Sequence, residues 1–282
     1  MEFTQQLTQI ICYIQFLNNM RIVLYMSEKP DVINLYNISC LMRFYPDFQY
    51  KIIRVKSKPQ QKRSSIRNIL SRIKNGPNYF LKDHKVIMDS IKEITPSINF
   101  DEFTSIIVDK VNDSKSEKVI SEYNPDIILQ CGAGILKKNI FLIPKLGTIN
   151  IHHGFAPEIR GVQSTFWAMY YGLYDKIGVS CHFIDEKLDT GIIISQHNYS
   201  LKSQDTFIDV QQELIKIGAD LLINAISKIQ KKNFSKTTEV KSYYFSNVDI
   251  KKYKKFKKMS YRAVETNASL KFKNLPKTSL IL

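Results

Sequence analysis

Two short segments of the chain gather residues whose side chains could carry out acyl-transfer chemistry. Residues 147–161 read GTINIHHGFAPEIRG, and residues 185–191 read DEKLDTG. In a strand, alternate side chains share a face, so Asn150 and His152 are expected to point the same way. An amide donor beside an imidazole can stabilise a carbonyl oxygen that becomes negative, while the imidazole moves a proton. Asp189 could then orient or charge His152, which makes these three residues the predicted catalytic group.

Each of these three residues also has an ordinary structural interpretation. A single Asn in a strand is commonly an edge or turn residue, a single His is commonly a satisfied polar side chain, and Asp-Thr-Gly is commonly a turn. The functional interpretation therefore depends on the combination of the residues and on the elements that position them.

Hydrophobic patterning predicts strands that alternate with helices along most of the chain. The predicted strands are 21–26, 51–55, 105–108, 126–130, 148–152, 179–184 and 192–198. The predicted helices are 31–44, 61–74, 79–93, 115–122, 164–171 and 205–229. This alternation predicts an α/β fold with a Rossmann-like, mainly parallel twisted sheet and helices on both faces. In such folds ligands bind beyond the carboxyl ends of the strands, where Asn150 and His152 would lie.

The same patterning divides the chain into three predicted parts. Residues 1–19 form an N-terminal extension, residues 20–232 a catalytic domain, and residues 233–282 a small C-terminal appendage with an aromatic cluster and a basic helix. The apolar patch at 10–17 is too short to cross a bilayer and lacks the charge pattern of a secretory signal. We therefore expect a cytoplasmic protein without a membrane partner.

Formal net charge is +15 and is concentrated in two runs. Residues 51–74 contain nine Lys or Arg, and residues 251–262 contain seven, with no Asp or Glu in either run. Each run could face phosphates or could be a solvated helix surface. Candidate phosphate ligands on the first run are Lys62, Arg63 and Arg67. That run lacks interleaved stacking aromatics, so nucleic acid is not an expected partner, although a non-catalytic, basic RNA-binding protein on the same fold stays an alternative.

Several common motifs are absent from the sequence. Gly132 and Gly134 follow a predicted strand, but the third glycine of a dinucleotide fingerprint falls on Lys137. The chain contains no P-loop, no H-E-x-x-H helix and no G-x-S-x-G elbow. Its four cysteines form no C-x-x-C pair, and its five histidines give no metal-binding spacing, so no metal is expected.

Taken together and in order, the polar segments resemble the folate-dependent formyltransferases, most of all the sugar-nucleotide N-formyltransferases. The resemblance extends over about 20–231, is strongest over 126–197, and implies 10-formyltetrahydrofolate as formyl donor and a primary amine as acceptor. It also implies that Asn150, His152 and Asp189 are the catalytic residues. The matching residues are Pro144-Lys145-Leu146-Gly147-Thr148, Asn150-Ile151-His152, Pro157, Arg160-Gly161 and Leu188-Asp189-Thr190-Gly191.

The resemblance further implies where the two substrates bind. The loop after the 126–130 strand would contact the folate pterin, and the 185–191 turn would line the same pocket. On the acceptor side, the 153–157 loop departs from the family pattern. Candidate residues for the folate site are Gly132, Ile135, Leu136, Asp185 and Gly191, and those for the acceptor site, besides the basic run, are His153 and Arg160.

Three acceptors are compatible with this family. Only about fifty residues follow position 229, fewer than a usual C-terminal barrel with its linker, which disfavours initiator transfer RNA. Glycinamide ribonucleotide enzymes are near-minimal catalytic domains, a role that leaves the basic run and aromatic tail unexplained. We therefore expect a nucleotide-linked amino deoxysugar, as in lipopolysaccharide or glycan biosynthesis, with the other two acceptors as alternatives and a homodimer left open.

Overall fold

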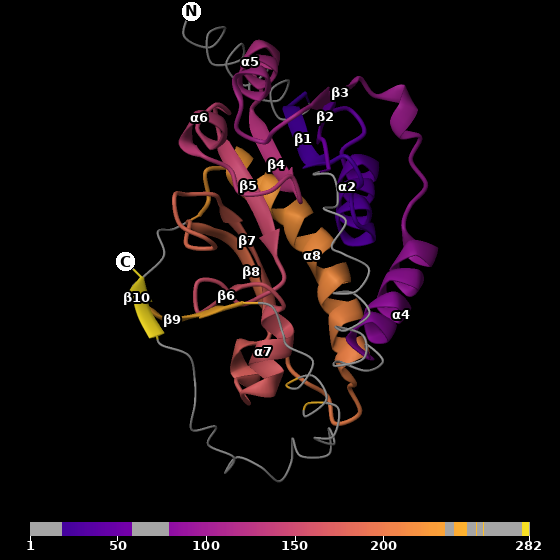
Figure 1. Cartoon of the computed structure of the whole chain (residues 1–282), viewed down its shortest axis with the longest axis vertical. Helices are drawn as coiled ribbons and strands as arrows, with labels where there is room; N and C mark the ends of the chain where they lie inside the picture. The colour runs from indigo at the N-terminus through magenta and orange to yellow at the C-terminus, as the bar shows by residue number, and fades with distance from the viewer. Residues whose placement is uncertain are drawn as a thin grey trace, which may run out of the picture.

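The computed structural model describes residues 19–57, 79–234, 240–246, 252, 256 and 278–281. The predicted 61–74 helix, with Lys62, Arg63 and Arg67, lies outside these residues, as do positions 1–18 and most of the basic C-terminal run. Figure 1 shows the whole chain, with the residues outside these ranges drawn as a thin grey trace.

A seven-stranded sheet forms the centre of the molecule, with strand order β3-β2-β1-β4-β5-β7-β8. The first five strands run parallel to their neighbours, and β7 and β8 are antiparallel additions at one side. The mainly parallel sheet is therefore confirmed. Its strands are β1 (Arg21–Ser27), β2 (Gln49–Val55), β3 (Ser105–Val108), β4 (Ile127–Cys131), β5 (Gly147–His152), β7 (Gly178–Phe183) and β8 (Ile193–Asn198).

Helices connect these strands, and their ends are encoded by local residues. Asp31 accepts the Asn34 N–H at the start of α2, and Thr206 with Asp209 forms a capping box at the start of α8. The helices are α2 (Val32–Phe44), α4 (Tyr79–Ile94), α5 (Ser114–Tyr123), α6 (Lys138–Phe141), α7 (Ser164–Tyr170) and α8 (Phe207–Gln230), with 3₁₀ turns at Phe100–Glu102 and Tyr174–Lys176.

The two faces of the sheet are covered by different helices, as predicted (Figure 1). Along β1, Ile22 and Leu24 belong to the core beneath α2 and α8, whereas Val23 and Tyr25 belong to the core beneath α5 and α6. This alternation follows from the period of two in a strand. Because both faces are buried, β1 is apolar throughout its centre, which is typical of a parallel strand.

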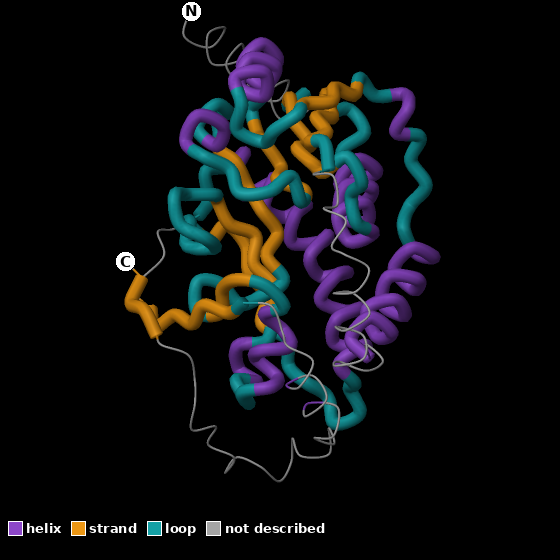
Figure 2. Tube along the Cα trace, in the orientation of Figure 1, coloured by secondary structure: helices purple, strands orange, loops and turns teal. Residues whose placement is uncertain are grey.

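A second, three-stranded sheet joins the C-terminal region to the part of the chain that contains the seven-stranded sheet. Strand β6 (Ile159–Gly161) pairs in parallel with β9 (Val240–Phe245), which pairs antiparallel with β10 (Thr278–Ile281) (Figure 2). None of these three short strands was predicted, because each depends on a partner far away in the sequence. The described part of the C-terminal region is thus hydrogen-bonded to the domain that carries the candidate site.

Among the described helices, none combines the length and the apolar character that a membrane-spanning segment requires.

Candidate active site

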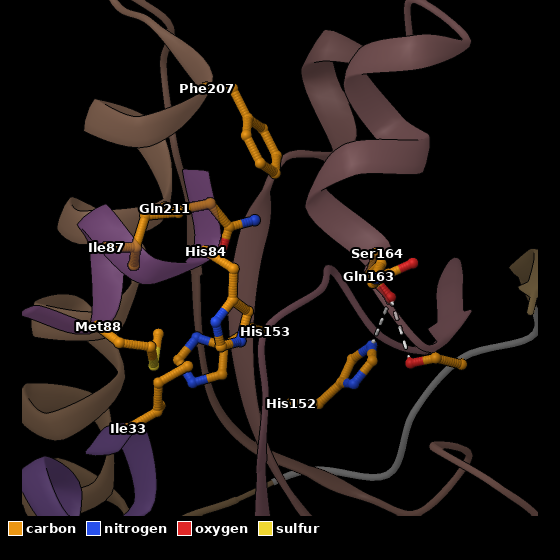
Figure 3. A pocket seen from close by; sticks show the side chains of 11 residues that line it. Ile33, His84, Ile87, Met88, His152, His153, Gln163, Ser164, Phe207 and Gln211 are labelled. Carbon is orange, nitrogen blue, oxygen red and sulfur yellow. Dashed lines mark hydrogen bonds between the residues drawn. The ribbon is translucent and has the colours of Figure 1, made fainter. Parts of the chain in front are cut away.

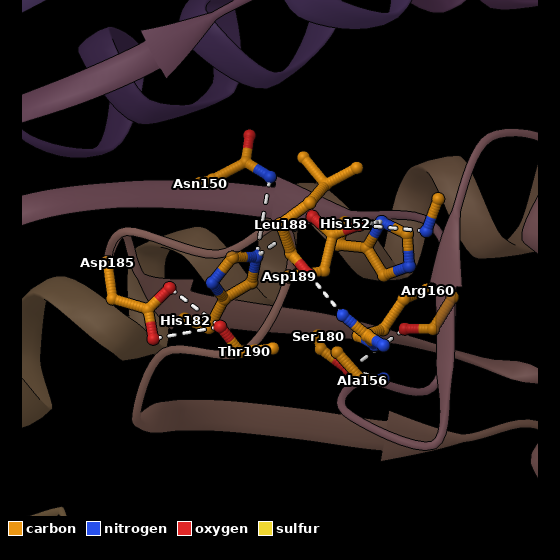
Figure 4. Close-up of polar contacts among 12 residues, drawn as sticks. Asn150, His152, Ala156, Arg160, Ser180, His182, Asp185, Leu188, Asp189 and Thr190 are labelled. Atoms are coloured by element: carbon orange, nitrogen blue, oxygen red, sulfur yellow. Dashed lines mark hydrogen bonds and ion pairs between the residues drawn. The ribbon is translucent and has the colours of Figure 1, made fainter. Parts of the chain in front are cut away.

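The carboxyl end of β5 places Asn150 and His152 next to the 185–191 turn (Figure 4). Asn150 is half-buried and His152 is buried. The chain leaves β5 through Gly154, where a Cβ would overlap His152 Nε2 and approach Ser164 Cβ to 2.6 Å. A glycine is therefore needed directly beside the imidazole, because a larger residue would displace that ring.

His152 is held so that one ring nitrogen stays available. Its Nε2 lies 2.9 Å from the carbonyl oxygen of Ile159 and 3.3 Å from Ser164 Oγ. Because a carbonyl oxygen only accepts, Nε2 must carry the hydrogen when the ring is neutral. Nδ1 then has a free lone pair and lies 3.7 Å from Asp189 Oδ2. A proton taken up at Nδ1 would face a carboxylate, which stabilises the imidazolium.

Asp189 is buried and lies between two histidines. Its Oδ2 accepts the Gly161 N–H at 2.9 Å, and its Oδ1 lies 3.7 Å from His182 Nε2. The backbone at Asp189 is left-handed, with φ of 54°, a conformation that Asp tolerates better than most residues. This turn aims the carboxylate inward, so the structure brings Asp189 together with His152.

His182 is a member of the cluster that sequence reasoning missed. Strands β5 and β7 pair so that Asn150 lies opposite His182, and Asn150 Nδ2 is 3.4 Å from His182 Nε2. His182 Nδ1 donates to the Phe183 carbonyl oxygen at 2.8 Å, which leaves Nε2 as the acceptor. Burial lowers the pKa of His182, while the Asp189 carboxylate opposes that shift. The only sequence signal was a histidine inside an apolar strand shortly before the 185–191 turn.

A cavity of about 360 Å³ opens beside this cluster, on the side of the β4 loop. Three of the predicted folate ligands, Ile135, Leu136 and Asp185, line it together with Asn150 and Asp189. The two remaining predicted ligands, Gly132 and Gly191, are not among its lining residues. The full lining is Gln130, Gly134, Ile135, Leu136, Asn150, His182, Ile184, Asp185, Glu186, Lys187, Leu188 and Asp189.

The lining of this first cavity suits a flat, partly apolar ring. Ile135 is 77% exposed at the cavity although it is large and apolar, so a bound ring would remove its surface from water. Gln130 fixes the loop, because its side chain accepts the Gly132 N–H at 2.8 Å and donates to the Gly134 carbonyl at 2.9 Å. Asp185 is already engaged by the Thr190 hydroxyl at 2.7 and 2.8 Å, so it also shapes the turn.

A second cavity of about 330 Å³ lies on the His152 side of the cluster (Figure 3). Helices α4 and α8 supply one part of its wall, and the residues after β5 and β6 supply another. Among the described residues that line it, none is Lys, Arg, Asp or Glu. The lining is Ile33, His84, Ile87, Met88, His152, His153, Gly161, Gln163, Ser164, Phe207 and Gln211.

His153 lines this second cavity. Its Nδ1 atom is buried and has no hydrogen-bond partner within the described part of the chain. Burial, together with repulsion from His152, lowers the pKa of His153 to about 4. The imidazole is therefore neutral at physiological pH, and its unpaired nitrogen is a ready partner for a ligand hydroxyl or amide.

Arg160, the other candidate for the acceptor site, lies between β9 and the 185–191 turn. It is absent from the linings of both cavities. Its Nε donates to Ser242 Oγ at 2.7 Å and its Nη1 donates to the Leu188 carbonyl at 3.1 Å. The guanidinium thus spans the gap between β9 and the turn that carries Asp189.

We expect the stability of the protein to fall between pH 6.5 and pH 4 because of His153. A folded-state pKa of about 4, against an ordinary value of 6.5, means that the unfolded chain binds more protons in this window. The contribution is fully present above pH 6.5, and its loss at pH 5 is about 2 kcal/mol. His182, whose pKa is also lowered, acts in the same direction.

Urea unfolding at pH 7.5 and pH 5.0 measures this effect. His153→Gln should lose less stability between the two pH values than the wild type. Ser116→Ala removes no titrating group and should keep the wild-type difference. An unchanged pH dependence in His153→Gln would contradict the lowered pKa.

Within the described ranges, His, Cys, Asp and Glu form no group of three or more that could hold a metal ion.

Comparison with known proteins identifies the class of protein that has this fold and this polar cluster at the end of β5. The family model described as Formyl transferase matches residues 82–226, just over half of the chain. This protein belongs to the formyl transferase family.

Curated relatives match only part of the chain. The methionyl-tRNA formyltransferase of Thermodesulfovibrio yellowstonii is 37% identical over 125 residues, which cover 44% of this chain and 40% of the relative. The methionyl-tRNA formyltransferase of Chlorobium chlorochromatii is 30% identical over 126 residues, with 45% and 40% covered. The chain thus aligns with about two fifths of the length of these relatives.

Solved structures share the fold over a longer stretch. A sugar N-formyltransferase from Shewanella aligns with a TM-score of 0.52 and 17% identity, covering 80% of this chain and 76% of that one. Glycinamide ribonucleotide transformylase 1 from Symbiobacterium toebii aligns with a TM-score of 0.51 and 15% identity, covering 76% and 89%. At these identities the likeness concerns the fold.

Proposed function

We propose that this protein transfers the formyl group of 10-formyltetrahydrofolate to the primary amine of a nucleotide-linked amino deoxysugar. The observation that carries the proposal is the arrangement of two cavities on either side of one polar cluster. Asn150 and Asp189 face the first cavity, and His152 faces the second. A donor bound in one cavity and an amine bound in the other would therefore meet at the cluster.

The first cavity supports a folate-type donor by its lining. Ile135, Leu136 and Ile184 offer apolar surface for the pterin ring, and the backbone around Gly134 offers polar groups at its edge. When bound, the donor supplies an activated formyl carbon that an amine can attack. Asn150 would donate an amide hydrogen to the formyl oxygen as negative charge develops there. His182 would orient that amide, since its Nε2 lies 3.4 Å from Asn150 Nδ2.

His152 is the proposed proton carrier. An amine that attacks the formyl carbon must lose a proton, and the free lone pair at His152 Nδ1 can accept it. The resulting imidazolium would be stabilised by Asp189 Oδ2 at 3.7 Å and by the Ile159 carbonyl at Nε2. The same proton can then be delivered to the departing nitrogen of the donor, directly or through water.

The second cavity favours a sugar over the other acceptors. About 330 Å³ lies at the lower end of the roughly 300–1,000 Å³ range of ligand pockets, so it holds one ring-sized group and not a whole nucleotide. His84, His153, Gln163 and Gln211 offer more hydrogen-bonding groups than a methionine side chain could use. Its apolar wall of Ile87, Met88 and Phe207 suits the methyl group and missing hydroxyl of a deoxysugar. The described lining offers no Lys or Arg for a pyrophosphate, so we propose that this group lies outside the part of the cavity that these residues line.

A panel of amines tests the acceptor. The purified chain would be incubated with 10-formyltetrahydrofolate and 3-amino or 4-amino deoxysugars linked to nucleotides, and formylated product would be measured by mass spectrometry. The N-acetylated form of each sugar is the matched control, because it lacks a free amine. We expect turnover of at least one amino sugar and none of its acetylated form.

A second candidate acceptor is methionyl-tRNA, because the matched curated relatives carry that activity in their names. Charged transfer RNA and glycinamide ribonucleotide therefore belong in the same panel at physiological salt. Robust formylation of methionyl-tRNA without turnover of any amino sugar would overturn the sugar acceptor and leave formyl transfer standing. Absence of turnover with every amine would overturn formyl transfer itself.

A further inference from the structure

We propose that strand β9 is part of the active site, because Ser242 on this strand holds Arg160 and thereby fixes the turn that carries Asp189. Ser242 and Arg160 are positioning residues, called here the β9 clamp, and neither lines a candidate substrate cavity. The inference rests on the proposed catalytic role of Asp189. It gives the C-terminal region a function in the chemistry of the neighbouring domain.

The Ser242 hydroxyl is fully buried and uses both its donor and its acceptor function. It accepts a hydrogen bond from Arg160 Nε at 2.7 Å and donates to the carbonyl oxygen of Pro157. This single hydroxyl therefore ties the guanidinium to the loop that follows β5. Without the Ser242 hydroxyl, Arg160 Nε would lose this acceptor and the guanidinium would shift toward another one.

Arg160 and its neighbour Gly161 hold the turn at two adjacent points, and Figure 4 shows Arg160 beside Leu188 and Asp189. Arg160 Nη1 donates to the Leu188 carbonyl at 3.1 Å, and the Gly161 N–H donates to Asp189 Oδ2 at 2.9 Å. The first bond fixes the backbone just before Asp189, and the second fixes its carboxylate. Because Asp189 has a left-handed φ of 54°, these contacts hold a conformation that few residues adopt unaided.

Strand β6 depends on β9 for its ladder. Arg160 pairs with Tyr244 and Gly161 pairs with Phe245, and in the described three-stranded sheet β6 is an edge strand with β9 as its neighbour. The guanidinium also lies over the Tyr244 ring at 5.9 Å. The segment matched by the family model ends at residue 226. The contacts that hold β6, and through it the Asp189 turn, therefore come from beyond the matched segment.

Ser242→Ala in the full chain tests the clamp by two measurements, hydrogen exchange and steady-state kinetics. We expect faster exchange in peptides covering 185–191, and a kcat about 10- to 100-fold lower, because small misplacements of catalytic groups have effects of this size. KM for donor and acceptor should stay within about twofold, since the clamp lines neither cavity. The matched control is Ser116→Ala, an equally buried serine on α5 that bonds the Lys110 carbonyl at 2.7 Å. It should change neither measurement.

Arg160→Lys keeps the positive charge but cannot reach Ser242 Oγ and the Leu188 carbonyl together. Arg160→Lys should lower kcat by a similar factor. The double variant Ser242→Ala with Arg160→Lys should be no slower than Arg160→Lys alone, because both residues act on the turn through the Leu188 carbonyl. Additive losses would contradict this, as would an unchanged kcat in Ser242→Ala. If hydrogen exchange over 185–191 is unchanged in Ser242→Ala, the clamp is overturned, whether or not the wild type is active. If the wild type formylates none of the amines, only the proposed function is overturned, because the exchange measurement does not depend on turnover.

Discussion

Replacing His152 by alanine is expected to lower kcat by at least about 10²-fold while leaving the protein folded. The imidazole is the group with a free lone pair at Nδ1, next to Asp189 Oδ2 at 3.7 Å. Asp189→Ala should have an effect of similar size, because the imidazolium would lose its carboxylate partner. Asn150→Ala should also fall in this range, since one donor to a developing oxyanion is worth about 10²- to 10³-fold. Steady-state kinetics with the accepted amine measure all three variants.

His197→Ala is the matched control for these variants, because His197 is an exposed histidine of the neighbouring strand β8. It should retain wild-type turnover. Thermal unfolding would be recorded for every variant, so that loss of fold is separated from loss of chemistry. Folded His152→Ala or Asp189→Ala protein with near wild-type kcat would remove that residue from the mechanism.

Replacing Gly161 by alanine is expected to lower the free energy of unfolding by at least about 3 kcal/mol. The backbone at Gly161 has a φ of 96°, which L side chains rarely adopt, and an added Cβ would overlap the Phe245 carbonyl oxygen of β9. Both β6–β9 pairing and the hydrogen bond from the Gly161 N–H to Asp189 would have to give way. Urea denaturation measures the change.

Gly134→Ala separates the two causes of this loss. Gly134 also has a positive φ, 117°, but a Cβ there would meet only Val111 Cγ1 at 3.9 Å. The control should therefore cost about 1 to 2 kcal/mol, from backbone strain alone. Equal destabilisation by the two variants would show that the close approach of β6 to β9 contributes nothing.

The sequence was sufficient to predict the main sheet, because the patterns that specify its strands are local. Apolar runs such as 21–26 and 126–130 became β1 and β4 with bounds shifted by one residue at most, and the period of two along β1 divides its side chains between two cores. The same local patterning predicted a strand over 148–152, which places Asn150 and His152 at the end of β5. Strands β6, β9 and β10 were missed because each forms by pairing with a segment far away in the chain.

The candidate site was only partly open to sequence reasoning. Asn150, His152 and Asp189 were found from a motif, and Ile135, Leu136, Asp185 and His153 do line the cavities beside them. Gly132 and Gly191 were assigned to the folate pocket, but they lie outside its lining. Gly191 packs closely against β7, because a Cβ there would overlap the Phe183 carbonyl oxygen.

What the sequence by itself determined is therefore the order of the elements of the main sheet and the candidate polar groups at the end of β5 and in the 185–191 turn. Only the tertiary structure decided that His182 lies opposite Asn150, that Arg160 reaches the Leu188 carbonyl, and that helices α4 and α8 supply one wall of the cavity beside His152. The physical reason is that side-chain period and turn preference act over a few residues. Strand register, in contrast, is fixed by burial and by hydrogen bonds between segments far apart in the chain.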